Sequence, residues 1–451
     1  MRARRLPRSL VAGLFLVLAA ASVVLAHARL VRSSPASNEH VPWAPTELQL
    51  EFSEAVTPRT SRVELVAPDS QRLQLVVRGD STNHNLLLAD VPALALPGDY
   101  RVEWRLLGSD GHPVTGRYTF TVDSTAAVAD TPRVLPPQSE AEKHEPPADA
   151  ATHRAIRFGS MLSLVVIIGS IAFALFVLPG TTRSAREAVA AFRAITESRL
   201  RLVVIVGASV LLILAVARLL SHAAFLSGSL ETVRTGDLAE LIVGTTFGRG
   251  WLLQVVATIV LIAMLRRNTH RWSVMIGPAA ALAISAAFLG HPAAVPDARF
   301  LSMSLDAVHL LAAGAWAGSI LMLALVAVPT AISVPVTHRI EVVRDLLRAF
   351  SPLALWCAAL VVATGAIGGW LQLRALNLVL GSAYGVVLLR KIVLVLVIAA
   401  LGAYHWRVLQ PAIGSEKSVA RLRISLAIDV VFVVLVLVAT TVLTGTPPPV
   451  R

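Results

Sequence analysis

RFGSMLSLVVIIGSIAFALFVLP, residues 157–179, decides the class of this fold. After Arg157 the stretch contains no charged residue. About 20 consecutive apolar residues are enough for an α-helix to cross the hydrocarbon core of a bilayer. The stretch therefore predicts a transmembrane helix.

Further apolar runs follow along the chain, at 200–221, 250–265, 273–290, 304–328, 352–373, 384–405 and 424–444. The whole chain is 55% hydrophobic with a mean hydropathy of +0.69. Together with the first span, these runs predict an α-helical polytopic membrane domain of eight transmembrane helices over residues 156–451. The net charge of +12 comes mostly from arginines in short loops between the spans. We therefore expect the lipid bilayer as a partner, and no nucleic acid.

Basic residues gather in alternate loops. They follow the first, third, fifth and seventh spans, at Arg183, Arg186, Arg193, Arg199, Arg201, Arg266, Arg267, Arg271, Arg339, Arg344, Arg348, Arg407, Lys417, Arg421 and Arg423. The other loops carry few basic residues. Positively charged loops stay in the cytoplasm, so the chain before the first span is predicted to lie outside.

Residues 27–122 have a different pattern. In YRVEWRL, residues 100–106, apolar and polar residues alternate, which places one face of a strand on a core and the other in water. Similar runs recur between turn signals such as Leu96-Pro97-Gly98-Asp99. About seven short strands predict a small all-β sandwich.

Two further segments flank this sandwich. Residues 1–26 have a basic start, an apolar run from Leu10 to Leu25 and small residues before His27, which predicts a secretory signal peptide cleaved after Ala26. Residues 123–155 are rich in Pro, Ala, Glu, Ser and Asp and lack aromatic residues. This composition predicts a flexible linker.

The sandwich carries candidate metal ligands. Cleavage after Ala26 would give His27 a free amine beside its imidazole, and the two can chelate one metal ion. Asp110 and His112 are two residues apart, so in an extended segment their side chains point the same way. Such a nitrogen and oxygen set suits Cu(II), and residues 27–122 contain no methionine for a thioether Cu(I) site. The alternative is that Asp110 belongs to a turn and His112 is a surface residue.

The membrane spans carry a second set of candidates. Met303, Asp306 and His309 open the fifth span at spacings of three, so they share a helix face. His291 ends the fourth span on the same predicted outer side. We interpret these four residues as a pathway through which a metal enters the membrane domain.

Other ionisable residues in the spans have simpler interpretations. His222 ends the second span, where it can contact headgroup water or join the metal pathway. His405 is interfacial or an exit ligand. Lys391, with its neighbour Arg390, is predicted to form a structural charge pair with Asp429 in the next span.

Several motifs resemble a known bacterial family. The first half is similar to the copper-resistance protein CopC in HARL (27–30), SPA (34–36), LEFSE (50–54) and SDGHPVTG (109–116). The second half is similar to CopD in GH (290–291), DAVHL (306–310), GAW (314–316) and LGAYH (401–405). The resemblance implies a cupredoxin-like Greek-key sandwich or barrel with a Cu(II) site made of His27, Asp110 and His112. It also implies an inner-membrane protein with its β-domain on the extracytoplasmic side, acting in copper uptake.

We therefore expect a transporter and not an enzyme. The β-domain would capture Cu(II) outside the cell and pass copper into or across the membrane. Its partners would be the copper ion and other periplasmic or cytoplasmic copper-handling proteins. Two alternatives stay open: passive copper sequestration without transport, and a copper- or haem-dependent membrane oxidoreductase in which His291 and His309 are axial haem ligands.

Overall fold

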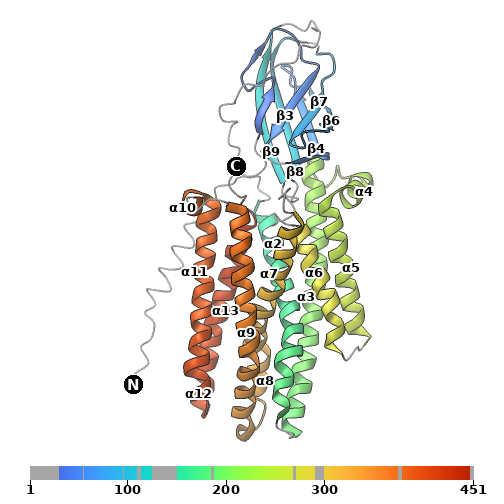
Figure 1. The fold of residues 1–451 in the computed structure, drawn as a ribbon. Coiled ribbons are helices and arrows are strands. Elements are labelled where there is room, and N and C mark those ends of the chain that lie inside the picture. Colours follow the sequence, from blue (N-terminus) through green and yellow to red (C-terminus); the bar gives the residue numbers. More distant parts are fainter. Residues whose placement is uncertain are drawn as a thin grey trace.

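The computed structural model describes residues 30–53, 55–94, 96–108, 113–123, 150–183, 187–267, 271–289, 299–373 and 378–446. A β-sandwich sits on one end of a bundle of long helices (Figure 1). The signal-peptide prediction and most of the linker prediction lie outside these residues.

The sandwich consists of two sheets. Its strands are β1 (Leu30–Ser34), β2 (His40–Val41), β3 (Glu47–Phe52), β4 (Val56–Val66), β5 (Arg72–Gln74), β6 (Val76–Gly79), β7 (Leu86–Asp90), β8 (Gly98–Gly108) and β9 (Pro113–Val122). One sheet has the order β1-β3-β7-β6 and the other β2-β9-β8-β4-β5. The prediction of a small β-sandwich is confirmed.

The alternating pattern of the sequence fills the space between the sheets. In β8, Tyr100, Val102 and Trp104 are buried. The Trp104 ring lies over β9 at Gly116, where an added Cβ would be 2.1 Å from a ring carbon. Glycine is therefore required at this position, because no side chain fits beneath the indole.

The helical part begins at Ala150, so the first helix takes in the last residues of the predicted linker. The α-helices are α2 (Ala150–Ala172), α3 (Glu187–Ser227), α4 (Thr235–Gly244), α5 (Thr246–Arg266), α6 (Ile276–Phe288), α7 (Arg299–Met322), α8 (Val328–Ala331), α9 (Val336–Leu373), α10 (Leu378–Gly381), α11 (Ala383–Tyr404), α12 (Gln410–Ala412) and α13 (Glu416–Leu443). The π-helical turns are η1 (Phe173–Val177), η6 (Leu323–Ala327) and η7 (His405–Leu409), and the 3-10 helices are η2 (Leu178–Arg183) and η3 (Trp272–Met275).

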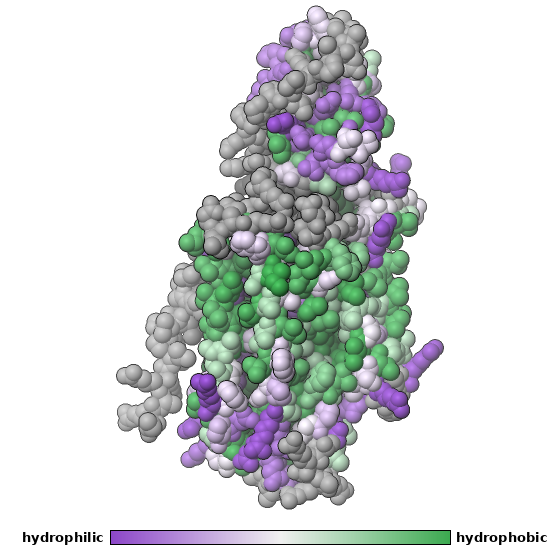
Figure 2. All heavy atoms as spheres, viewed as in Figure 1, coloured by the Kyte–Doolittle hydropathy of each residue, from purple (hydrophilic) through white to green (hydrophobic). Residues whose placement is uncertain are grey.

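Among the described residues, seven helices are long and apolar enough to cross a membrane. The predicted span at 273–290 is instead a shorter apolar helix, Trp272–Phe288. The prediction of eight spans is therefore not confirmed. Figure 2 shows a broad hydrophobic band across the visible face of the bundle, with hydrophilic residues on the β-domain and at the opposite end.

The centre of the bundle is held by close contact between α2 and α7. A Cβ added at Gly169 of α2 would lie 2.3 Å from the backbone of Gly318 in α7. Helices in a membrane associate through such small residues, because the missing side chains let the backbones approach. Ser319 also donates a hydrogen bond to the Gly169 carbonyl, at 3.4 Å.

Candidate functional site

A cavity of about 320 Å³ lies in the half of the bundle nearest the β-domain. Helices α2, α3, α5, α7, α9, α11 and α13 contribute to its walls. Its polar and charged lining residues include His153, Arg157, Arg218, His222, Gln254, Asp306, His309, Tyr384 and Lys391. The remaining surface is mostly apolar, so these groups are the ones that can recognise a ligand.

His309 reaches the cavity from α7. Its Nδ1 lies 2.9 Å from Thr364 Oγ1 on α9. Thr364 donates its own hydroxyl proton to the Leu360 carbonyl at 2.6 Å, so it accepts at His309. This arrangement assigns the ring proton to Nδ1 and leaves the lone pair on Nε2, which is the form that binds a metal.

Asp306 lies one turn before His309 and lines the same cavity. Met303 does not: it packs against the cluster formed by Ala283 and Ala287 of α6 with Ala307. A different methionine, Met161 of α2, lines the cavity in its place, and its sulfur lies 3.9 Å from Thr441 Oγ1 of α13. The structure thus keeps Asp306 and His309 together and separates Met303 from them.

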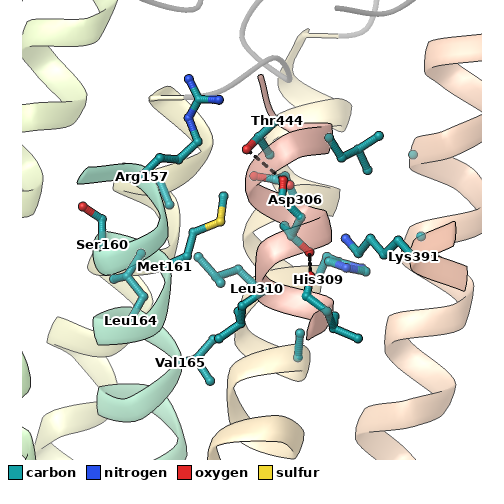
Figure 3. A pocket seen from close by; sticks show the side chains of 18 of the residues that line it. Arg157, Ser160, Met161, Leu164, Val165, Asp306, His309, Leu310, Lys391 and Thr444 are labelled. Carbon is teal, nitrogen blue, oxygen red and sulfur yellow. Dashed lines mark hydrogen bonds between the residues drawn. The ribbon is translucent and has the colours of Figure 1, made fainter. Parts of the chain in front are cut away.

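Lys391 is part of this site. Figure 3 shows its side chain extending from α11 toward His309, and its charge interacts with both His309 and Asp306. The predicted pair of Lys391 or Arg390 with Asp429 is therefore wrong. Helices α11 and α13 are antiparallel and meet near Gly414; Lys391 lies 23 residues before that glycine and Asp429 only 15 after it. The difference of eight residues is about 12 Å along a helix axis.

A second pair of histidines lines the cavity nearer the β-domain. His222 of α3 donates from Nδ1 to the Arg218 carbonyl at 2.7 Å, which assigns the lone pair of the neutral ring to Nε2. The ring stacks on Phe247 at 4.5 Å and meets the His153 ring at 5.6 Å. His153 was not predicted, because it lay in the stretch interpreted as a linker.

The β-domain contacts the bundle beside these histidines. Leu107, near the end of β8, is only 3% exposed. It packs in an apolar cluster made of Leu219, Ala223 and Leu226 of α3, Leu241 of α4 and Phe247 of α5. Phe247 belongs both to this cluster and to the cavity wall, so the contact between domains adjoins the cavity.

Four predicted ligands lie outside the described residues: His27, Asp110, His112 and His291. Strand β8 ends at Gly108 and β9 begins at Pro113, so Leu107 is three residues from Asp110 in the sequence. Among the residues that the structure does describe, no three His, Cys, Asp or Glu side chains are grouped to hold a metal ion. Asp306 and His309 both line the cavity, and their role as metal ligands stays a prediction.

His405 lies away from the other candidates. Its Nε2 is 2.6 Å from Ser425 Oγ, and its Nδ1 is 3.5 Å from Asp429 Oδ2. Both ring nitrogens therefore have partners on α13. We do not include His405 among the metal ligands.

Three family models match successive parts of this chain. Residues 30–123 match the family model "CopC domain", residues 148–299 match "Copper resistance protein D-like, N-terminal domain", and residues 344–443 match "Copper resistance protein D". The order of the matches corresponds to the β-sandwich followed by the helical bundle.

Curated relatives give the same order. The copper transport protein CutJ of Bacillus subtilis is 28% identical over 394 residues, which cover 84% of this chain and 68% of CutJ. Copper resistance protein C of Escherichia coli is 34% identical over 116 residues, covering 24% of this chain and 90% of that protein. Copper resistance protein D of Pseudomonas syringae pv. tomato is 28% identical over 297 residues, covering 63% of this chain and 92% of that protein.

The chain belongs to the CopC/CopD copper-resistance family. It joins a CopC domain and a CopD membrane domain in one polypeptide. Membership of this family makes copper the expected ligand of the chain.

Sequence patterns could have indicated some of the residues that were missed. Met161 is four residues after Arg157 on an apolar helix, so both lie on one face. Lys391 stands out as a charge inside an apolar run. Its neighbours, however, come from a helix about 80 residues earlier, and spacing along the chain does not predict which helices pack together.

Proposed function

We propose that this protein moves copper from its extracytoplasmic CopC domain into the membrane through the cavity. His27, Asp110 and His112 are the proposed Cu(II) ligands of the β-domain, and the inner membrane of a bacterium is the proposed location. Copper then passes the pair His153 and His222, and reaches Asp306 and His309, with His291 as a further proposed ligand.

The observation that supports this proposal most is the shared position of Phe247. The ring stacks on His222, lines the cavity and packs in the cluster that holds Leu107. The end of β8, which precedes the proposed ligand Asp110 by three residues in the sequence at Leu107, is thus held beside the cavity. A tethered donor near its acceptor has a high effective concentration, so transfer needs no diffusional search.

Lys391 explains how such a site releases its cargo. A copper cation at Asp306 and His309 has the Lys391 ammonium as a neighbour, and like charges in a medium of low dielectric repel strongly. Among the described residues, two proposed ligands face one opposing charge, so we expect copper to bind weakly enough to move on. The site therefore suits passage better than storage.

The test is copper accumulation in cells that produce His309→Ala, compared with the unaltered protein. We expect accumulation to fall to that of cells without the protein. Leu310→Val, on the next residue of the same helix, is the matched control and should accumulate copper normally. If His309→Ala accumulates copper normally, transport through the cavity is wrong. If in addition tolerance is kept, passive sequestration by the β-domain explains the data better.

A further inference from the structure

Two ionisable side chains meet inside the membrane domain, apart from the cavity. Asp429 lies in the middle of α13 and is 2% exposed, and His405 opens the π-helical turn η7 with a side chain that is 12% exposed. The atoms His405 Nδ1 and Asp429 Oδ2 are 3.5 Å apart. Ionisable groups in membrane helices are costly, and they mark functional sites such as proton relays.

The local helix geometry brings these groups together. Ser425 and Asp429 are one turn apart on the same face of α13. His405 lies against both, because its Nε2 is 2.6 Å from Ser425 Oγ while its Nδ1 faces Asp429. The widened turn η7 begins at His405, and such π-helical turns are frequent at functional sites.

One atom of this group has no partner. Among the described residues, Asp429 Oδ1 is buried and makes no hydrogen bond. With Asp429 ionised and His405 neutral the pair has a charge of −1, and one added proton brings it to zero, whichever atom carries the proton. In apolar surroundings a change of one charge has a large effect on the energy of the bundle.

The pair lies on the far side of an apolar layer from the cavity. Val433 lines the cavity and is one turn from Asp429 on α13; Ile398 lines it two turns from His405 on α11. Both side chains are buried. In the other direction, Arg407 and Arg421 are exposed at the basic end of the bundle. Along α13 the pair thus lies between the cavity and the basic end.

Other titratable groups on the packed helices lie toward one end or the other. Helix α13 packs against α2, α7, η6, α9, α11 and η7. On the cavity side these helices carry His153, Arg154, Arg157, Asp306, His309, Tyr384, Arg390 and Lys391; on the basic side they carry His338, Arg339, Glu341, Arg344, Asp345, Arg348 and Arg407, with Lys417, Arg421 and Arg423 on α13 itself. Between them, Cys357 is buried in α9, and the Tyr404 ring lies 6.3 Å from the His405 ring.

The order Ser425–His405–Asp429 matches that of a serine nucleophile triad, but the surroundings do not suit catalysis. Ser425 lies inside α13, where backbone N–H groups are used by the helix and none is left to stabilise an oxyanion. None of the three side chains is among the residues that line the cavity. The chemistry that remains is the binding of a proton.

We propose that Asp429 and His405 form a proton-binding site that exchanges one proton with the basic end of the bundle as copper occupies the cavity. An O–H or N–H bond forms when the proton arrives and breaks when it leaves, and no electron is transferred. The copper cation and the proton repel each other across the apolar layer, so each weakens the binding of the other by the same factor. The proton site rests on the geometry of α11 and α13, and its link to copper rests on the proposed function.

The proton site is tested by infrared spectroscopy of the metal-free full-length protein in lipid nanodiscs. We expect a carboxylic acid C=O band that titrates with pH, disappears in Asp429→Asn and changes frequency in His405→Gln. Glu231→Gln, which removes an exposed carboxylate, is the control and should keep the band. The proposal is overturned if Asp429→Asn leaves the titrating bands unchanged. If Asp429→Asn does not fold, unchanged bands in His405→Gln overturn it.

The link to copper is tested in proteoliposomes that contain a pH-sensitive dye. We expect copper entry to move protons in the unaltered protein, and proton movement in Asp429→Asn to fall to that of protein-free liposomes. Copper entry without proton movement in the unaltered protein overturns the coupling and leaves the proposed function intact. Absence of copper entry contradicts the proposed function, and the infrared result still decides the proton site.

Discussion

His309 and His405 are both largely buried histidines of the same helical bundle, but their surroundings differ. His309 directs one nitrogen to Thr364 on α9 and lines a cavity with the rest of its ring. His405 has Ser425 at one nitrogen and Asp429 at the other. The chemistry of a buried histidine is therefore set by how many partners the neighbouring helices supply. One partner leaves a lone pair for a metal, and two partners leave none.

The largest expected difference between these histidines is in copper affinity. In a background with His27, Asp110 and His112 all replaced by Ala, which removes the proposed side-chain ligands of the β-domain, we expect His309→Ala to weaken copper binding by about 100-fold or more. Loss of a residue that merely supports a ligand costs about 10–100-fold, and loss of the ligand itself costs at least as much. His405→Ala should leave the affinity unchanged. Titration with copper under matched conditions measures the affinity of both variants. An equal loss of affinity in His309→Ala and His405→Ala would contradict the different roles assigned to the two histidines.

The contact between the domains should show the next largest effect. Leu107→Ala removes a buried side chain from the cluster on α3, α4 and α5, which costs about 2 kcal/mol or more. We expect the equilibrium constant for docking of the β-domain on the bundle to fall by about 30-fold, so that more of the protein has its β-domain undocked. Distances between spin labels at Ser70 and Glu231 measure this. Val76→Ala is the control, because Val76 is an exposed apolar residue of the same domain; loss of docking there as well would contradict the role of Leu107.

Much of this architecture could be predicted from the sequence. The alternation in residues 100–106 is that of β8. Seven of the eight predicted spans coincide with long helices among the described residues. Both patterns are local in the sequence. Contacts between distant segments could not be predicted. Met303 shares a helix with His309, but its side chain packs against α6. Lys391 interacts with Asp306 and His309 of α7, although by charge alone an ion pair with Asp429 was an equally good prediction. Helix packing decides such contacts, and the spacing of residues does not encode it.

A smaller effect is expected at the residue that orients His309. Thr364→Val keeps the size of the side chain and removes the oxygen that accepts from Nδ1. We expect copper affinity to fall by about 10-fold, since the ring is no longer fixed in the tautomer with its lone pair on Nε2. Copper titration in the background that lacks the His27, Asp110 and His112 side chains measures it. Ser425→Ala, which removes the corresponding partner of His405, should have no effect; an equal loss would contradict the assignment of His309 alone to copper.

The smallest effect is expected on the stability of the β-domain. Its ionisable residue Glu103 has charged partners but remains close to water. Burial raises the pKa of Glu103, but hydrogen bonds from Arg72 at 2.9 Å and Arg101 at 2.7 Å outweigh it, and the pKa lies below its usual value. The ionised Glu103 carboxylate therefore stabilises the folded protein fully at pH values above its pKa in the unfolded chain. This stabilisation is lost as the pH falls through the lower pKa of the folded state.

Glu103→Gln removes the charge that interacts with the two arginines. We expect it to lower the free energy of unfolding of the metal-free protein by less than about 1 kcal/mol at neutral pH. The difference from the unaltered protein should vanish in acid below the folded pKa. Thermal unfolding at a series of pH values measures it. A difference that stays constant across the series would show that the effect comes from packing and not from charge.

The glycine contact between α2 and α7 restricts how the protein can work. Because Gly169 and Gly318 bring two backbones together with no side chain between them, these helices cannot slide or separate without opening a void. They form a fixed frame that carries Met161 on one side and Asp306 and His309 on the other. An opening of the cavity toward the basic end of the bundle would then come from other helices that move against this frame, and a shift of α11 would carry Lys391 away from His309.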